Sequence, residues 1–161
     1  MRLKGPWPKE RIEAFLNEAV IPMRLAVASA SGVPLVLSLW FVWQEQAIWC
    51  ATRGEARVVA LLRRHPACGF EIAADSPPYR GVRGQGVASV VEAEGAALLN
   101  RLLDRYGVAP QSRLARRLTR HPEREVAIRI EPTWILSWDY SARMSDALRA
   151  TVADPANRAS R

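Results

Sequence analysis

Six apolar segments of strand length, separated by glycine, proline or short polar turns, constrain this chain more than any other feature. Alternation of apolar and polar residues over such lengths is typical of half-buried strands. The pair Ser31-Gly32 is a tight-turn signal, so the first two segments are expected to form a hairpin. The predicted strands are residues 23–29, 34–43, 47–52, 68–73, 81–92 and 125–140, the last with a break at Pro132. Glycines 84 and 86 indicate a bend or bulge in the fifth strand.

Four other segments have the spacing of amphipathic helices. Their apolar residues recur every three or four positions, and proline or glycine stands near their ends. The predicted helices are residues 8–19, 55–64, 93–106 and 111–119. Because most strands are joined by short connections, the elements together predict a mainly β fold with some α (β+α), a small six-stranded antiparallel barrel with peripheral helices.

The second predicted strand, residues 34–43, is apolar almost throughout, with the sequence PLVLSLWFVW. In a strand with one solvated face, apolar and polar residues would alternate. A continuous apolar run is expected either for a strand covered on both faces or for a strand at a contact between two chains. The sequence leaves both possibilities open.

The length of 161 residues suits one domain. We expect that domain to occupy residues 1–146 and residues 147–161 to form a flexible C-terminal tail. No apolar run reaches the roughly 18 residues that span a bilayer, and the first eleven residues lack the apolar stretch of a secretion signal. The sequence therefore predicts a cytoplasmic protein that does not enter the membrane.

The net charge is +7, and arginine far outnumbers lysine. This charge fits either a polyanionic partner or a phosphorylated ligand, but a GC-rich genome gives the same bias toward arginine. The basic residues are scattered and do not form one block with interleaved aromatic residues. Nucleic acid is therefore an unlikely partner, and a small molecule is the expected one.

No constellation for metal binding or covalent catalysis is found in the sequence. Cys50 and Cys68 lie in apolar strands without metal-ligand spacing, so buried free thiols are expected. His65 and His121 each follow a basic helix and precede proline, as helix-end residues do. No catalytic residue is assigned and no metal is expected; if the protein is an enzyme, a bound cofactor carries the chemistry.

Two segments are candidates for binding. Residues 52–57 (TRGEAR) lie where a strand passes into a helix, so backbone N–H groups, the Thr52 hydroxyl and the guanidinium groups of Arg53 and Arg57 could converge on one phosphate. The alternative is that Thr52 caps the helix and the arginines are solvated. Residues 79–86 (YRGVRGQG) place Tyr79 and two arginines beside glycines that let a ligand approach the backbone; the alternative is a charged edge strand.

The order of these blocks resembles the pyridoxamine 5'-phosphate oxidase-related, FMN-binding split-barrel proteins. The resemblance covers roughly residues 10–144 and is carried by a series of blocks. These blocks are residues 24–28 (RLAVA), 32–34 (GVP), 38–43 (SLWFVW), 48–52 (IWCAT), Arg57, 62–66 (LRRHP), 79–86 (YRGVRGQG), 130–132 (IEP) and 137–140 (SWDY).

The resemblance implies a split β-barrel that works as a homodimer with flavin sites at the subunit interface. It implies that Ser38, Leu39 and Trp40 lie along the flavin ring and that Thr52, Arg53 and Arg57 hold the phosphate. It also maps Arg83 and Trp138 to the cofactor and places substrate beside Tyr79 and Arg80.

The function that the resemblance implies is an FMN-dependent oxidoreductase of unknown substrate. An F420-dependent reductase is the enzymatic alternative, because a longer polyanionic tail would use Arg53, Arg57, Arg80 and Arg83 together. Haem is a further candidate cofactor. A non-catalytic ligand-binding or sensor protein with the same barrel is the alternative from another class.

Overall fold

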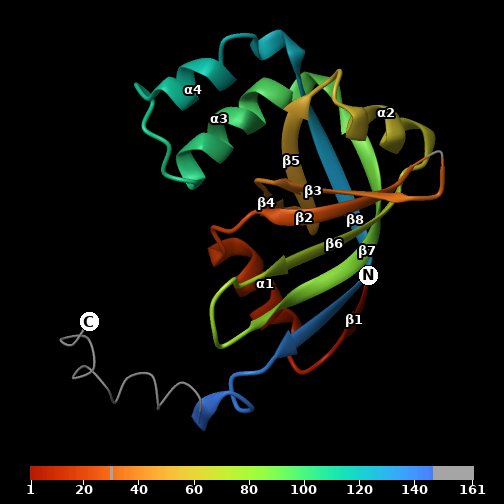
Figure 1. Cartoon of the computed structure of the whole chain (residues 1–161), viewed down its shortest axis with the longest axis vertical. Helices are drawn as coiled ribbons and strands as arrows, with labels where there is room; N and C mark the ends of the chain where they lie inside the picture. The colour runs from red at the N-terminus through yellow and green to blue at the C-terminus, as the bar shows by residue number, and fades with distance from the viewer. Residues whose placement is uncertain (30, 147–161) are drawn as a thin grey trace, which may run out of the picture.

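The computed structural model describes residues 1–29 and 31–146 and shows a curved sheet with helices at both of its ends (Figure 1). Short 3₁₀ turns lie at Glu92–Glu94 and Pro122–Arg124. The predicted tail, residues 147–161, lies outside the described residues. The elements in chain order are β1 (Arg2–Lys4), α1 (Lys9–Glu18), β2 (Met23–Ala28), β3 (Pro34–Leu39), β4 (Val42–Gln44), β5 (Ala47–Arg53), α2 (Arg57–Arg64), β6 (Ala67–Ala73), β7 (Arg80–Val91), α3 (Gly95–Arg105), α4 (Arg113–Leu118) and β8 (Glu125–Asp139).

The strands form one sheet in the order β3-β2-β6-β7-β8-β5-β4, in which each neighbouring pair is antiparallel. The short β1 adds to β8 in parallel. Because β3 and β4 lie at opposite ends of this order and do not pair, the barrel is open along one seam. The mainly β, antiparallel split barrel with peripheral helices is confirmed, with eight strands among the described residues where six were predicted.

The predicted strand over residues 34–43 is wrong as a single strand. Its first part is β3 and its last part is β4, so the chain crosses the open seam at Trp40 and Phe41. Phe41 is fully buried and Trp40 stacks on Tyr106, so packing of these two rings turns the chain out of strand geometry. Within this chain β3 is not covered on both faces, because Pro34, Val36 and Ser38 are exposed.

The predicted irregularity in the fifth strand is confirmed as a bulge. Gln85 faces Trp134 while Gly86 faces Pro132, so Thr133 on β8 has no residue opposite it. A proline within a long strand is tolerated at such a position, because the ladder is already interrupted there. β8 therefore continues through Pro132.

The barrel interior holds one main core, closed at one end by α2 and packed at the other against α1. Val58, Val59 and Leu62 of α2 are buried in this core. Cys50 and Cys68 are buried free thiols, as predicted. Burial raises the pKa of both, that of Cys68 to about 11, so both remain protonated at neutral pH.

No helix in the described part of the chain is both long and apolar enough to cross a bilayer.

Candidate functional site

A pocket of about 340 Å³ lies between the end of β3, the end of β5 and the helices α3 and α4. Five of the residues predicted to bind a cofactor line it. Three lie at the end of β3 and in the seam crossing that follows it, Ser38, Leu39 and Trp40, and two come from the end of β5, Thr52 and Arg53. Segments twelve residues or more apart in the sequence therefore meet at one pocket, whose volume lies in the range of about 300–1,000 Å³ common for small-molecule sites.

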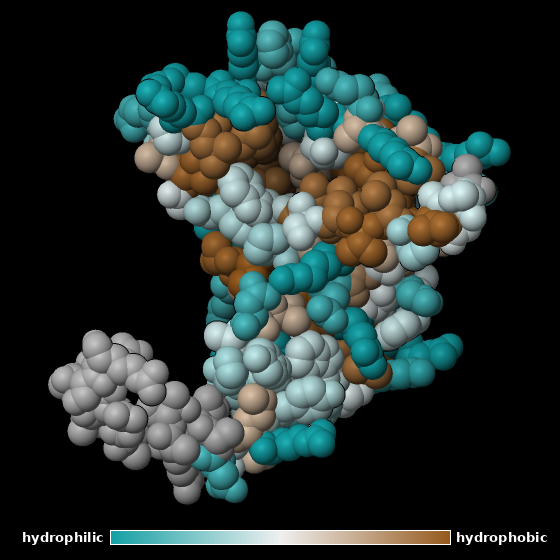
Figure 2. All heavy atoms as spheres, viewed as in Figure 1, coloured by the Kyte–Doolittle hydropathy of each residue, from teal (hydrophilic) through white to brown (hydrophobic). Residues whose placement is uncertain are grey.

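The pocket has an apolar wall and a polar end. Leu99 and Leu102 of α3 and Leu114 and Leu118 of α4 form much of the wall, while Thr52, Arg53 and Glu125 bring polar groups. Apolar residues gather in two areas on this face of the molecule, one over α3 and α4 and the other over the β2–β3 hairpin (Figure 2). An apolar wall with a few convergent polar groups is the usual composition of a ligand site.

Trp40 is held in place at the C-terminal end of α3. Its ring stacks on that of Tyr106, with centroids 4.8 Å apart and an interplanar angle of 18°. The Tyr106 hydroxyl accepts a hydrogen bond from the Phe41 N–H and donates one to the Ile21 carbonyl. Burial raises the pKa of Tyr106, so the hydroxyl keeps its proton and the crossing segment stays fixed.

The turn after β5 leads directly into the N-terminus of α2. The Gly54 N–H donates to the Arg124 carbonyl of the neighbouring chain segment, which fixes the turn against β8. The helix begins at Arg57, and its N-cap is Ala56, which provides no side-chain cap. The interpretation of Thr52 as the helix cap is therefore wrong. A helix N-terminus without a side-chain cap or an acidic first turn, and with Arg57 as its first residue, favours a bound anion.

Arg53 is paired with two carboxylates. Its Nε lies 3.6 Å from Glu125 Oε1, and its Nη1 lies 3.8 Å from Glu55 Oε1. Glu125 is buried, whereas the side chain of Glu55 is largely exposed. Burial raises the pKa of Glu125, which the Arg53 charge counteracts and the Glu55 charge reinforces.

The other predicted residues lie away from this pocket within one chain. Arg83 is exposed on β7 and lines a separate hollow with Arg24 and Glu71. Arg80 lines a third hollow beside Trp7. Trp138 packs against Tyr140, with 5.4 Å between the ring centroids, and the Tyr140 N–H donates to the Tyr79 carbonyl.

Since β7 lies between β6 and β8, the interpretation of residues 79–86 as an edge strand is wrong.

Sequence reasoning missed the residues that the helices and β8 bring to the pocket. Leu114 and Leu118 are four positions apart in a basic helix, so amphipathic spacing is the signal that could have identified them. Glu125 offers no such signal, because it begins an alternating strand and its burial depends on pairing with β5.

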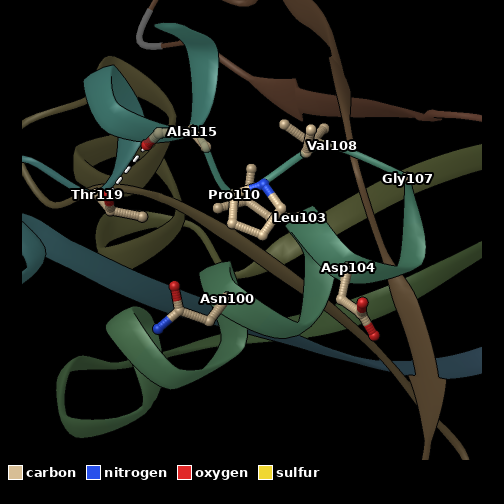
Figure 3. Close-up of a pocket in the computed structure, with 9 residues that line it drawn as sticks. Asn100, Leu103, Asp104, Gly107, Val108, Pro110, Ala115 and Thr119 are labelled. Atoms are coloured by element: carbon tan, nitrogen blue, oxygen red, sulfur yellow. Dashed lines mark hydrogen bonds between the residues drawn. The ribbon is translucent and has the colours of Figure 1, made fainter. Parts of the chain in front are cut away.

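A larger hollow of about 590 Å³ lies between α3, α4 and the segment 107–110 that joins them (Figure 3). It is lined mainly by small and apolar residues with Asp104 and Asn100 on α3, and none of the predicted binding residues lines it. The Thr119 hydroxyl there donates to the Ala115 carbonyl at the end of α4. The hollow therefore lacks convergent polar groups, and we assign no site to it. Among the described residues, no three His, Cys, Asp or Glu side chains cluster as metal ligands would.

Comparison with solved structures finds several proteins that share this fold. An F420 reductase matches with a TM-score of 0.66 and 22% identity over 81% of this chain and 97% of its own. A conserved hypothetical protein of Mycobacterium tuberculosis matches with a TM-score of 0.67 and 25% identity over 84% and 86%. A FAD-binding protein of Mesorhizobium loti matches with a TM-score of 0.58 and 15% identity over 81% and 93%.

No curated protein sequence matches this chain significantly. The family model described as pyridoxamine 5'-phosphate oxidase, in contrast, matches residues 8–139, which include every strand from β2 to β8 and the whole pocket. The chain therefore belongs to the pyridoxamine 5'-phosphate oxidase family.

Proposed function

We propose that this chain binds FMN and acts as a flavin-dependent oxidoreductase. The observation that carries the proposal is the pocket at the open seam, because it joins an apolar wall to a polar end that carries Thr52 and Arg53. An isoalloxazine ring needs the first feature and a phosphate needs the second. Membership of the family and the FAD-binding relative support a flavin as the ligand.

The chain's own residues would bind and orient this cofactor. The ring would lie along Ser38, Leu39 and Trp40, with Trp40 kept in position by its stacking on Tyr106. The phosphate would be held by Thr52, Arg53 and Arg57 at the start of α2. When bound, FMN supplies the hydride chemistry, and the protein contributes binding, orientation and charge.

We further propose that two chains form a homodimer and complete each other's sites. The face of β3, β2, β6 and β7 that points away from the core exposes Val36, Val87 and Arg83 together with small residues such as Ala28 and Ala67. A second copy on this face would bury the exposed apolar side chains, and Arg83 and Trp138 of one chain would then contribute to the cofactor site of the other. Substrate would enter beside Tyr79 and Arg80.

An F420-dependent reductase is the second candidate, and the similarity to an F420 reductase favours it. Within one chain, Arg53, Arg80 and Arg83 line three separate hollows, so a polyanionic tail could reach all of them only across an assembly. Two further hypotheses, haem as the cofactor and a non-catalytic barrel with another ligand, are tested by the same experiment.

The test is a titration of the purified protein with FMN, F420 and haem, followed by absorption and by flavin fluorescence. We expect FMN to bind and Arg57→Ala to weaken it about tenfold or more, because a charge-assisted contact to phosphate contributes roughly 1.5–3 kcal/mol. Arg64→Ala is the matched control, since Arg64 is an exposed arginine at the opposite end of the same helix. It is expected to bind FMN as the unchanged protein does.

Selective retention of F420 without FMN binding would favour the deazaflavin enzyme. Absence of binding by all three compounds would overturn the cofactor proposal and leave the sensor interpretation. If FMN binding were weakened equally in the Arg57 and Arg64 variants, α2 would contribute only general positive charge and no specific contact to the phosphate.

A further inference from the structure

Glu125 is a buried carboxylate in the wall of the proposed cofactor pocket. It is 6% exposed, and it is the single buried Asp or Glu in residues 1–29 and 31–146. It lines the pocket together with Ser38, Thr52 and Arg53. Charged side chains are almost never fully buried without a partner, because loss of hydration disfavours the charged form. The ionisation of Glu125 therefore depends on the groups around it.

The strand register supplies its partner. Glu125 begins β8 directly opposite Arg53, the last residue of β5. The Nε–Oε1 distance of 3.6 Å exceeds the 2.7–3.2 Å of an N–H···O hydrogen bond, so the two groups attract each other without a close bidentate contact. A loosely held guanidinium is able to turn toward a stronger acceptor.

The charged groups that face Glu125 come from one side of the pocket only. Arg53 and, beyond it, Glu55 belong to β5 and its following turn. The helices α3 and α4 contribute leucines to the pocket wall. If Arg53 were neutralised by a ligand, Glu125 would be left in an apolar wall beside a second anion, and both effects raise a carboxyl pKa. The buried position of Glu125 already raises its pKa with Arg53 in place.

We propose that a phosphate group entering this pocket takes Arg53 from Glu125, and that Glu125 binds one proton as the phosphate binds. The inference rests on the proposed function, because it requires a phosphorylated ligand in the pocket. The charges balance: the guanidinium keeps its proton and changes its anionic partner, while the carboxylate accepts a proton from solvent. Glu125 thus competes with the phosphate for Arg53, and the affinity for phosphate depends on pH.

The consequence is that the affinity for FMN depends on pH through the titration of both Glu125 and the phosphate. Above pH 7.5 the phosphate is already a dianion, since its second pKa is about 6, so its own titration no longer contributes. In that range FMN affinity should fall as pH rises, up to about tenfold per pH unit when a full proton is taken up. Riboflavin, which lacks the phosphate, should leave Arg53 on Glu125 and bind without this dependence.

The experiment measures dissociation constants for FMN and riboflavin between pH 7.5 and 9 by flavin fluorescence. Three proteins are compared: the unchanged chain, Glu125→Gln and Glu55→Gln. Glu55 is the matched control, because it also faces Arg53 at 3.8 Å but is largely exposed. We expect Glu125→Gln to flatten the FMN profile and to bind FMN more tightly at pH 9, whereas Glu55→Gln keeps the slope of the unchanged protein.

A second measurement needs no variant. Calorimetric titration in two buffers of different ionisation enthalpy should show net proton uptake on FMN binding and none on riboflavin binding. Parallel FMN profiles for Glu125→Gln and the unchanged protein, or equal proton uptake for the two ligands, would overturn this inference while FMN binding itself stands. Absence of FMN binding by the unchanged protein at every pH would overturn the proposed function and this inference with it.

Discussion

Gly84 allows strands β6, β7 and β8 to pack closely at the centre of the sheet. A Cβ at this position would lie 2.6 Å from Phe70 Cζ and would overlap the Trp134 carbonyl oxygen, which is backbone and cannot swing away. We therefore expect Gly84→Ala to reduce the free energy of unfolding by about 1–3 kcal/mol, the usual cost of overpacking. Thermal unfolding followed by circular dichroism measures the change, at roughly 2–4 °C per kcal/mol for a chain of this size.

Gly32→Ala is the control for this prediction. Gly32 has a φ of +81°, but no atom lies within 4 Å of the Cβ that would be added. Its substitution should therefore carry only the backbone cost of about 1–2 kcal/mol for a side chain in the left-handed region. If Gly84→Ala unfolds at the same temperature as the unchanged protein, the close approach at Gly84 does not constrain the sheet.

Individual site residues differ in how far the sequence could predict them. Thr52 and Arg53 were identifiable because the sequence places a hydroxyl and a guanidinium where a strand passes into a helix, and the structure places both at one pocket. Glu125 was not identifiable, because its burial arises from antiparallel pairing of β8 with β5, more than 70 positions earlier in the chain. The pattern of one segment contains no information on such a distant partner.

At the scale of elements, hydrophobic periodicity located the long strands and the four α-helices of the described residues. It missed β1, because three residues are too few for a pattern and the pairing partners lie at Trp134, Ile135 and Leu136. It also joined β3 and β4, because the crossing residues Trp40 and Phe41 are as apolar as the strands on either side. The turn there results from tertiary packing of the two rings, and no breaker residue marks it.

The β4–β5 hairpin has a strained two-residue turn. Glu45 and Gln46 have φ values of 52° and 57°, the left-handed region required at both centres of a type I′ turn. Asparagine and glycine adopt this conformation at lower cost, so Glu45→Asn with Gln46→Gly should stabilise the protein by about 1 kcal/mol. Calorimetric or optical melting should show a rise of roughly 2–4 °C.

The single change Gln46→Ala is the matched control for the hairpin. Alanine has a Cβ and meets the same steric cost in the left-handed region, so no gain in melting temperature is expected. A rise equal to that of the double variant would mean that side-chain removal, and not backbone conformation, sets the stability of this turn.

At the scale of the whole molecule, one chain does not bring all the predicted cofactor residues together. Five line the pocket at the seam and Arg57 begins α2 beside it, but Arg83 lies on the outward face of β7 and Trp138 packs against Tyr140. The sequence could indicate each block yet could not show this separation, because it depends on which face of the curved sheet each residue occupies. A second chain on the outward face is the proposed way to unite the groups.

This assembly gives the last prediction. Val36 is 62% exposed near the middle of β3, on the outward face of the sheet, so Val36→Asp would place a charge in an apolar contact and weaken dimerisation by about tenfold or more. Val20→Asp is the control, because Val20 is 52% exposed in the connection between α1 and β2, outside the strands that form that face. Light scattering after size-exclusion chromatography should show a dimer for the unchanged and Val20 proteins and a shift to monomer for Val36→Asp, with FMN affinity lost in parallel. A monomer that binds FMN with full affinity would mean that the seam pocket is sufficient in one chain and that Arg83 and Trp138 have no part in the site.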